Sequence, residues 1–252
     1  MMDALNPIAL LVTYLALVAI IMARYVVIAG AMHWALWMRD ENKVKARRLT
    51  KIIPTRKVIR HEIRLSLISS FIYAAPGALL LEMWEAGGTA IYSGPVTTFD
   101  GWAYVLLSAG LYLFAHDTYF YWTHRVMHHP RFYRATHAGH HRSKQPTPWA
   151  SFSFDPLEAL ISAWFLPAVA LFIPIHVGVV LVLLTIMTMN AVFNHAGWEI
   201  YPKRWLSGWF GSVMITASHH NLHHTKFKGN YGLYFRFWDK VMGTDRGLET
   251  GS

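Results

Sequence analysis

Long apolar stretches constrain the fold of this chain more than any other feature of its sequence. Five stretches approach or meet the roughly 20 mostly apolar residues that a membrane-crossing helix needs, namely residues 7–38, 65–81, 102–122, 157–173 and 175–193. Only 15% of the 252 residues are charged, against about 25% in an average soluble protein. Too few polar side chains therefore remain to cover so many apolar helices in water. We expect an all-α integral membrane protein with four to five transmembrane or re-entrant helices, rather than a soluble helical core.

Prolines and one arginine mark the expected interruptions of these stretches. Pro76 and Gly77 are expected to break the second stretch, and Pro174 is expected to turn the fourth and fifth stretches into a hairpin. Arg24 lies inside the first stretch. Its side chain either extends to the membrane surface or marks the true end of the first span.

Lysine and arginine are distributed unevenly between the connections. Residues 39–64 hold ten basic and three acidic residues, whereas residues 84–100 hold two acidic residues and no lysine or arginine. The positive-inside rule places the basic connection in the cytoplasm. The amino terminus is then outside, and a helical cap with the carboxy terminus lies in the cytoplasm. The net charge of +9 is thus expected to face anionic lipid headgroups rather than nucleic acid. Because the carboxy terminus carries no retrieval signal, we expect a bacterial inner membrane, or the endoplasmic reticulum if the source is eukaryotic.

Most of the 15 histidines lie between His116 and His224, at regular spacings. One HxxxH pair and two HxxHH boxes recur, and single histidines stand before the last box and at the end of the fifth stretch. These ten residues are His124, His128, His137, His140, His141, His195, His219, His220, His223 and His224. On a helix, residues at i, i+3 and i+4 share one side, so an HxxHH box presents three imidazoles over about 100° and can supply two adjacent ions. Zinc, copper, iron and nickel accept imidazole ligands. Because a four-coordinate site cannot use ten histidines, we expect two metal ions within the cap.

Two carboxylates are candidates for roles beside these ligands. Asp117 precedes His124 by seven residues and therefore lies within about 20° of it on a helix, from where it can receive a ligand's spare N–H. Glu199 follows His195 by four residues and can orient that imidazole or act as an oxygen ligand. His116 points away from this direction and is expected to lie outside the ligand set.

Several ordered motifs resemble the fatty acid hydroxylase/sterol desaturase superfamily of membrane di-iron oxygenases. They are HDTYFYWTHRVMH at 116–128, HAGHH at 137–141, PTPWAS at 146–151, SHHNLHH at 218–224, GNYG at 229–232 and FWDKVMGTD at 237–245. As an ordered set these boxes are specific, although any one of them alone is a weak signal. The PTPWAS run and the doubled histidine at 219–220 are most similar to sterol C5-desaturases.

The resemblance implies two non-haem iron ions, molecular oxygen as cosubstrate and a membrane lipid whose unactivated C–H bond is hydroxylated or desaturated. Zinc can take the place of iron in recombinant protein. Position by position, the resemblance assigns the ligand role to the boxes at 124–128, 137–141 and 220–224, with His195 and His219 as further members. Electrons are expected from a separate ferredoxin-like or cytochrome b5-like donor with its reductase. Aromatic residues such as Trp149, Phe152 and Phe154 would line the substrate's path from the bilayer.

The sequence thus divides into residues 1–110 with transmembrane helices and the basic loop, a catalytic domain at 111–245, and a tail at 246–252 that could derive from cloning. Two other functions remain open on the residues alone. A non-redox dizinc hydrolase at the membrane surface would need an open metal position and a general base. A bis-histidine haem electron carrier would leave most of the clustered imidazoles unused.

Overall fold

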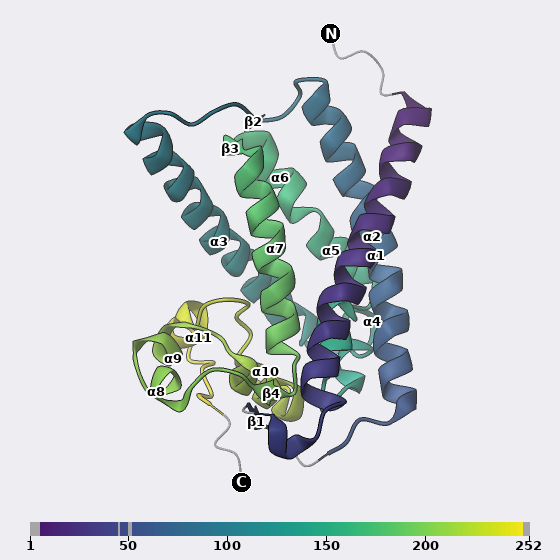
Figure 1. Ribbon diagram of the computed structural model, residues 1–252, viewed down its shortest axis with the longest axis vertical. Helices are drawn as coiled ribbons and strands as arrows, with labels where there is room; N and C mark the ends of the chain where they lie inside the picture. The colour runs from purple at the N-terminus through teal and green to yellow at the C-terminus, as the bar shows by residue number, and fades with distance from the viewer. Residues whose placement is uncertain (1–5, 45, 50–51, 249–252) are drawn as a thin grey trace.

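The computed structural model describes residues 6–44, 46–49 and 52–248. Figure 1 shows tall helices that stand side by side on a compact lower part, into which residues 195–248 fold. Helix α1 (Pro7–Trp37) begins where the side chain of Asn6 accepts hydrogen bonds from the backbone N–H groups of Ile8 and Ala9. It continues through Arg24 without a break. Arg24 therefore does not end the first helix.

Helix α2 (Arg56–Glu85) runs beside α1 and is longer than its apolar stretch predicts. The expected break at Pro76 is wrong, because α2 continues through this buried proline. Proline removes a single backbone hydrogen bond, and packing against neighbouring helices can compensate for that loss in a membrane helix.

Helix α3 (Phe99–Met127) forms the opposite flank of the bundle, and α7 (Val177–Asn194) stands between α3 and α1 (Figure 1). The fourth apolar stretch is two short helices, α5 (Pro156–Ala163) and α6 (Phe165–Phe172). At the upper end, β2 (Ile91–Tyr92) pairs in parallel with β3 (Ile175–His176) and so joins the α2–α3 connection to the turn before α7. The predicted turn at Pro174 is present between α6 and β3.

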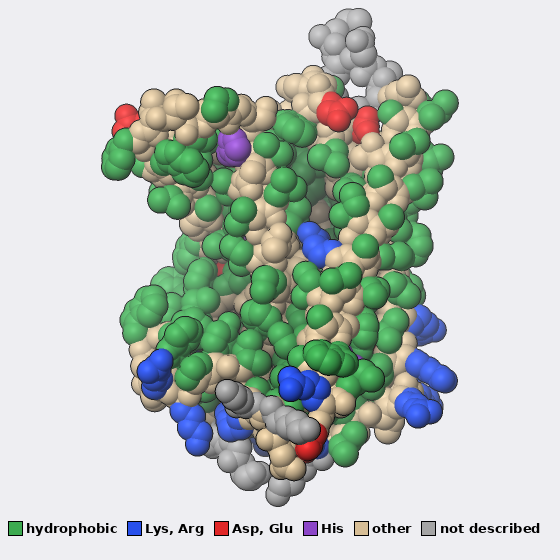
Figure 2. Space-filling model, in the orientation of Figure 1, with side chains coloured by type: hydrophobic (Ala, Val, Ile, Leu, Met, Phe, Trp, Pro, Cys, Tyr) green, Lys and Arg blue, Asp and Glu red, His purple; other side chains and the backbone are tan. Residues whose placement is uncertain are grey.

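Among the described residues, three helices are long and apolar enough to cross a membrane: α1, α2 and α7. Large apolar side chains on their outer sides are exposed, for example Val27 (67%) and Leu181 (62%). In Figure 2 the flanks of the helices are covered by hydrophobic side chains, while most of the visible lysines and arginines gather at the lower end. The mostly helical membrane class expected from the sequence is therefore confirmed, and the number of spans stays a prediction.

The lower part is built from short elements contributed by distant parts of the chain. They are η1 (Glu41–Lys43), β1 (Arg47–Arg48), α4 (Pro130–Thr136), η2 (His140–Arg142), η3 (Pro148–Phe152), β4 (Trp198–Glu199), α8 (Lys203–Leu206), α9 (Trp209–Val213), α10 (Ala217–Lys226) and α11 (Phe237–Val241). Strand β1 pairs antiparallel with β4, with Arg47 opposite Glu199. The basic connection after α1 is thereby tied to the segment that follows α7.

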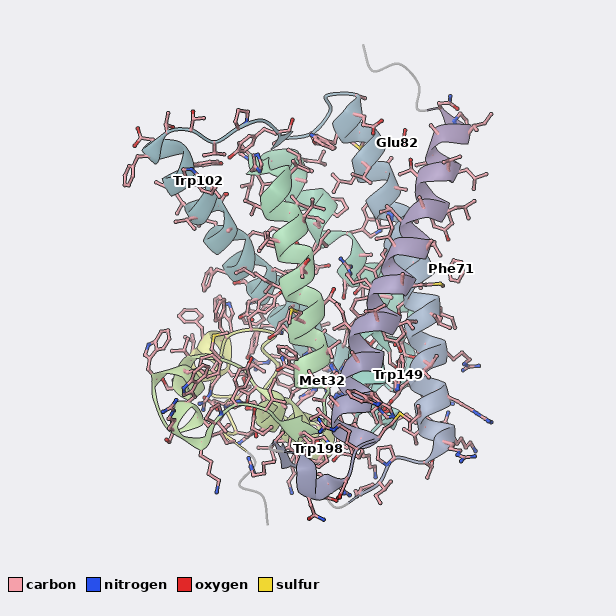
Figure 3. The ribbon with its side chains drawn as sticks, in the orientation of Figure 1. Met32, Phe71, Glu82, Trp102, Trp149 and Trp198 are labelled. Carbon is pink, nitrogen blue, oxygen red and sulfur yellow. The ribbon has the colours of Figure 1, made fainter. Side chains whose placement is uncertain are left out.

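Trp149, in the PTPWAS run, locks η3 against α1 and α2 near the lower end (Figure 3). Its backbone carbonyl accepts hydrogen bonds from the Tyr25 hydroxyl of α1 and the Ser66 hydroxyl of α2, each at 2.9 Å. A Cβ on Gly30 would lie 3.2 Å from the Trp149 ring, so the absent side chain lets the indole approach α1 closely. This packing holds η3 against the lower ends of α1 and α2, beside the histidine-rich region.

Candidate metal centre

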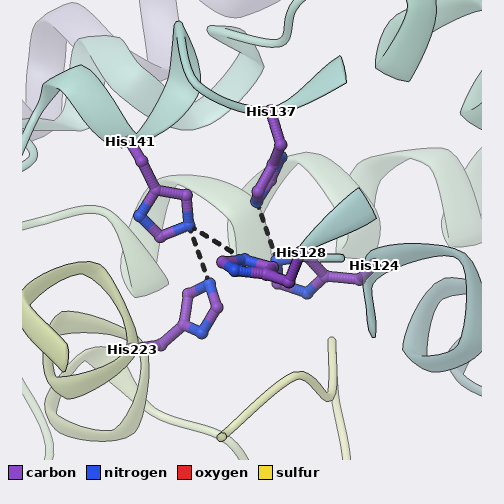
Figure 4. Close-up of side chains that lie close together, drawn as sticks. All are labelled: His124, His128, His137, His141 and His223. Atoms are coloured by element: carbon purple, nitrogen blue, oxygen red, sulfur yellow. Dashed lines mark hydrogen bonds between the residues drawn. The ribbon is translucent and has the colours of Figure 1, made fainter. Parts of the chain in front are cut away.

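The histidines of the boxes converge into two separate groups. The first group consists of His124, His128, His137, His141 and His223, and the second of His140, His195, His220 and His224. Within each group the candidate ligand atoms all lie within 4.8 Å of one another. Figure 4 shows the imidazoles of the first group turned toward one another from different segments. Among the described residues, both groups contain histidine alone, so the donor set is entirely imidazole.

Each HxxHH box contributes to both groups. His137 and His141 belong to the first group and His140 to the second, whereas His220 and His224 belong to the second and His223 to the first. The residues at i and i+4 thus face one group, and the residue at i+3 faces the other. For the box on α10 this is the helical arrangement that the spacing predicts. The box at 137–141 divides its histidines between the two groups in the same way without lying on one α-helix. His137 follows the end of α4, and His140 and His141 lie in the short 3-10 helix η2.

The Nε2 atoms meet at distances that suit ligands of a common ion. In the first group, the Nε2 of His137 lies 2.9 Å from that of His124, and the Nε2 of His141 lies 3.0 Å from that of His223. In the second group, His220 Nε2 lies 2.9 Å from His195 Nε2 and 3.0 Å from His224 Nε2. Two nitrogens that each lie about 2.1 Å from one ion, at about 90° to each other, would be about 3.0 Å apart.

The opposite ring nitrogen, Nδ1, is held by an oxygen acceptor in most of these histidines. Backbone carbonyls accept from five of them, at 2.7–3.0 Å: Tyr231 from His124, Ser153 from His140, Ala191 from His195, Gly229 from His223 and Ser143 from His224. A proton on Nδ1 leaves Nε2 with a lone pair and no hydrogen. Two such lone pairs about 3 Å apart repel each other unless a cation lies between them. The residues therefore fit a pair of bound metal ions.

His137 differs from the others, because a carboxylate receives its Nδ1–H. Glu158 Oε2 lies 2.8 Å from His137 Nδ1, and both side chains are buried. A carboxylate behind a ligating histidine fixes its tautomer and makes it a stronger donor. Sequence analysis missed Glu158, although an acidic residue within an otherwise apolar stretch was a signal that could have revealed it.

Burial keeps these imidazoles neutral, which is the form that binds metal. It lowers the pKa of His140 to about 4 and that of His195 to about 3. For His137, His223 and His224, burial and then the charges of neighbouring histidines lower the pKa well below its ordinary value. Near neutral pH the centre therefore presents uncharged donors and needs no proton release to accept a cation.

The two groups lie against each other. The ring centres of His141 and His224, from different groups, are 4.6 Å apart, and those of His137 and His140 are 5.0 Å apart. A small cavity of about 30 Å³ adjoins both groups and is lined by His124, His137, His140, His195, His220, Glu158, Ser151, Asn194, Phe120, Phe154, Ala191, Gly232 and Leu233. Of the aromatic residues predicted to line a substrate path, Phe154 borders this cavity, whereas Trp149 and Phe152 pack against Tyr25 of α1.

The structure does not bring Asp117 to a ligand histidine. Its Oδ1 accepts hydrogen bonds from the backbone N–H groups of Leu233, Tyr234 and Phe235, at 2.7–3.1 Å. This carboxylate thus anchors the segment whose Tyr231 carbonyl receives the His124 N–H. Both Asp117 and His124 lie on α3 as the spacing argument assumed, but the Oδ1 of Asp117 binds the returning backbone instead of a histidine N–H.

Glu199 likewise binds groups other than His195, namely a backbone N–H and two hydroxyls at the beginning of α10. Its Oε2 accepts from the Ser218 N–H at 3.0 Å and from the hydroxyls of Ser218 and Thr216, both at 2.7 Å. Glu199 therefore holds the beginning of α10, the helix that carries three ligand histidines.

His219 is the one predicted ligand that lies outside both groups. Its Nδ1 accepts from the Thr216 N–H at 3.1 Å and caps α10. His116, which was left out of the ligand set, also lies apart, with its Nδ1 3.0 Å from the Tyr234 hydroxyl.

Asp239 is a second residue that sequence analysis missed, although it lies in the FWDKVMGTD motif. Its carboxylate accepts from the backbone N–H groups of Tyr231 and Gly232, at 2.9 and 2.8 Å. It fixes the GNYG loop, whose carbonyls at positions 229 and 231 support one ligand histidine each. These two motifs therefore act on the metal centre through backbone geometry.

Comparison with known proteins finds similar sequences among sterol desaturases and sterol oxidases. The Delta(7)-sterol 5(6)-desaturase ERG3B of Gibberella zeae is 30% identical over 193 residues, which cover 75% of this chain and 58% of that protein. The C-4 methylsterol oxidase erg25 of Schizosaccharomyces pombe is 31% identical over 195 residues, covering 73% of this chain and 61% of that protein. The lathosterol oxidase of Rattus norvegicus is 32% identical over 145 residues, covering 58% and 47%.

The chain spans about three fifths or less of the length of these curated relatives. No solved structure matches it. The family model described as fatty acid hydroxylase matches residues 109–244, which is more than half of the chain and includes all nine grouped histidines. The chain therefore belongs to the fatty acid hydroxylase family.

Proposed function

We propose that this chain is an O₂-dependent, non-haem di-iron oxidoreductase that hydroxylates or desaturates an unactivated C–H bond of a membrane lipid. The proposed ligands are the nine histidines of the two groups, without His219. The observation that carries the proposal is the pairing of Nε2 atoms at about 3 Å in histidines whose Nδ1–H is already donated elsewhere, for example His124 and His137. The relatives named above, which are sterol desaturases and oxidases, support lipid oxidation as the reaction class.

Bound iron would supply the activation of oxygen and the removal of hydrogen from carbon, chemistry that protein side chains cannot perform. The chain's own contribution is to hold the imidazoles and to exclude water. The cavity of about 30 Å³ is roughly the size that holds one water molecule. The apolar part of its wall is formed by Phe120, Phe154 and Leu233, and we propose that a lipid carbon approaches the centre along these side chains. A wall of this kind admits a hydrocarbon segment and favours no polar group.

The proposed catalytic unit is residues 111–245, and its electrons would come from a separate ferredoxin-like or cytochrome b5-like donor with its reductase. The distribution of basic residues supports an orientation with the metal centre on the cytoplasmic side. The relatives named above come from eukaryotes and give no support to a bacterial inner membrane. They favour the endoplasmic reticulum as the location that we propose.

The test compares His140→Ala with His176→Ala in protein reconstituted into membranes with iron, a reductant and a lipid extract. His140 belongs to the second group, whereas His176 lies at the upper end of the molecule, where its Nε2 is 3.0 Å from the Gly94 carbonyl oxygen. We expect His140→Ala to lose lipid-dependent oxygen consumption and part of the bound metal, and His176→Ala to retain both. Lipid oxidation by His140→Ala at the parent rate would refute the proposal.

The same preparation distinguishes the other two functions. A dizinc hydrolase would transform its substrate without oxygen or reductant, and a haem carrier would show a Soret band. A haem carrier would use only two of the nine grouped histidines, and a hydrolase would need a general base, whereas neither group contains a carboxylate among the described residues.

A further inference from the structure

An exposed apolar surface lies on the carboxy-terminal part of the molecule, away from the metal centre. It consists of Trp205 and Trp209 on α8 and α9 and of Phe237, Val241 and Met242 on and after α11, and we call it the aromatic patch. Trp209 is 76% exposed and Val241 is 58% exposed. Large apolar side chains gathered in this way on a surface indicate an interaction site rather than ordinary contact with water.

A shallow cleft opens within the patch. It has a volume of about 320 Å³ and is lined by Arg204, Trp205, Gly208, Trp209 and Phe210. One wall is rigid, because the rings of Trp205, Phe210 and Tyr201 pack on one another with centres 4.8–6.3 Å apart. Arg204 is exposed, and no hydrogen bond or ion pair to another described residue engages its guanidinium. The cleft thus combines a free cation with aromatic faces.

The charge of the surrounding segment is strongly positive. Residues 200–245 contain six lysines and arginines and two acidic residues. Asp239 is fully buried and Asp245 is paired with Arg236, so five of the six basic side chains lie outside any ion pair among the described residues. In Figure 2, hydrophobic side chains gather over α9 and α11, with lysine and arginine side chains beneath them. Tryptophan and basic residues at adjacent levels are typical of the boundary between the headgroups and the acyl chains of a bilayer.

The aromatic patch continues directly onto a helix of the apolar bundle. The Phe237 ring of α11 contacts the Phe114 ring of α3, with centres 5.4 Å apart, and Trp238 contacts Trp122 at 5.7 Å. Higher on the same helix, Leu106 and Leu107 are 71% and 57% exposed. A bilayer that surrounds the upper part of α3 would therefore meet α11 at the level of Phe114.

We propose that α8, α9 and α11 rest in the cytoplasmic-side surface of the bilayer, with the aromatic patch among the acyl chains and Arg204 bound to the phosphate of an anionic phospholipid in the cleft. The guanidinium supplies paired N–H donors and a full charge for a phosphodiester. Trp205 and Trp209 border the glycerol and upper acyl region, where tryptophan is preferred. The carboxy-terminal part is then a membrane-bound layer rather than a freely hydrated cap.

The absence of cysteine allows spin labels to be attached at single introduced cysteines in the full chain. Trp209→Cys reports on the patch, Val27→Cys on the exposed lipid-facing side of α1, and Asn42→Cys on the hydrated connection after α1. In phosphatidylcholine vesicles that contain phosphatidylglycerol, we expect the label at position 209 to collide readily with oxygen and poorly with a water-soluble nickel chelate, as at position 27. The label at position 42 should show the opposite pattern.

Either of two outcomes would overturn the proposal. Accessibility to nickel at position 209 equal to that at position 42 would mean that the patch faces water. Exclusion of both oxygen and nickel, with broadening from a neighbouring label, would mean that a second copy of the chain covers it.

The role of Arg204 is tested with Arg204→Gln and the adjacent Lys203→Gln, each combined with the label at position 209. Adding phosphatidylglycerol to pure phosphatidylcholine should reduce the nickel accessibility of the label in the parent chain and in Lys203→Gln. We expect Arg204→Gln to lose that response. A full response in Arg204→Gln would remove the phosphate contact from the proposal.

Discussion

Single hydrogen bonds decide which nitrogen of most grouped histidines faces the proposed metal centre. The spacing of the boxes made the grouping of these histidines predictable, because residues three or four apart on a helix are neighbours wherever the helix lies. Their acceptors were not predictable. His124, for example, donates to the Tyr231 carbonyl, 107 residues further along the chain. No local pattern encodes such a contact, and for the same reason Asp117 was assigned to a histidine that it does not touch.

The Glu158 carboxylate supports one histidine of the first group, His137. Removing this carboxylate frees the His137 ring and leaves the His137 Nδ1–H without an acceptor in a buried site. We expect Glu158→Ala to weaken metal binding about 10- to 100-fold, and Glu158→Gln to weaken it less, because its amide oxygen still accepts. Competition with a chelator in detergent measures the affinity.

The matched control is Glu82→Gln, since Glu82 lies at the upper end of α2 and accepts from Thr13 of α1 (Figure 3). It should bind metal as the parent does. An unchanged affinity in Glu158→Ala would show that His137 needs no carboxylate behind it.

Short segments, rather than long helices, hold the ligands in register. The box at 137–141 was expected on a helix, yet α4 ends at Thr136 and the box continues as a 3-10 turn. The Gly139 N–H donates to Asp155 Oδ2 at 2.7 Å, which fixes this turn through a residue 16 positions away. Helical periodicity thus predicted the correct neighbours on α10, while tertiary contacts produced the same division of ligands at 137–141.

The GNYG loop depends on the backbone conformation of Gly229. Its φ of +92° is unfavourable for residues with side chains, and an added Cβ would collide with the Thr244 carbonyl oxygen. We expect Gly229→Ala to lower the free energy of unfolding by about 1–3 kcal/mol and to displace the carbonyl that supports His223. Thermal unfolding followed by circular dichroism measures the first effect.

Gly110→Ala is the corresponding control, because nothing lies within 4 Å of its added Cβ and it sits inside α3. It should leave stability unchanged or slightly improved. Equal melting temperatures for the two variants would contradict the importance of the loop.

The two groups of histidines lie at one end of the bundle of apolar helices. Composition and apolar stretches were sufficient to predict the helical membrane class, because hydrocarbon solvent excludes most other folds. The sequence did not reveal that the fourth stretch is divided at Trp164, nor that β1 and β4 join the first connection to the region after α7. Both features depend on which segments meet in space.

The proposed orientation can be checked with an impermeant maleimide in sealed vesicles. We expect a cysteine at Asn42 to react from the cytoplasmic side and one at Ser93, in the upper connection, to react from the other side, since both positions are exposed. Reaction of both cysteines from the same side would contradict a membrane crossing between them.

The buried histidines make stability depend on pH in a defined direction. Their pKa values are lower in the folded protein, about 4 for His140 and about 3 for His195, than the ordinary value near 6.5. Between these limits the unfolded chain binds more protons, so the free energy of unfolding decreases as the pH falls. We expect the melting temperature of metal-free protein to be steady above about pH 7 and to decrease steadily below about pH 6.5. A constant or rising melting temperature on acidification would contradict the burial of neutral imidazoles.

Each group combines a histidine in α3 or directly after α7, namely His124 or His195, with histidines of α10, which lies close to the end of the matched region. During synthesis, both groups of histidines would therefore stay incomplete until His220, His223 and His224 have emerged from the ribosome, even if the earlier helices have already entered the bilayer. If the proposed ions bind, they can do so only after α10 is complete, and a chain that stalls before α10 would carry its apolar helices without either complete group of histidines.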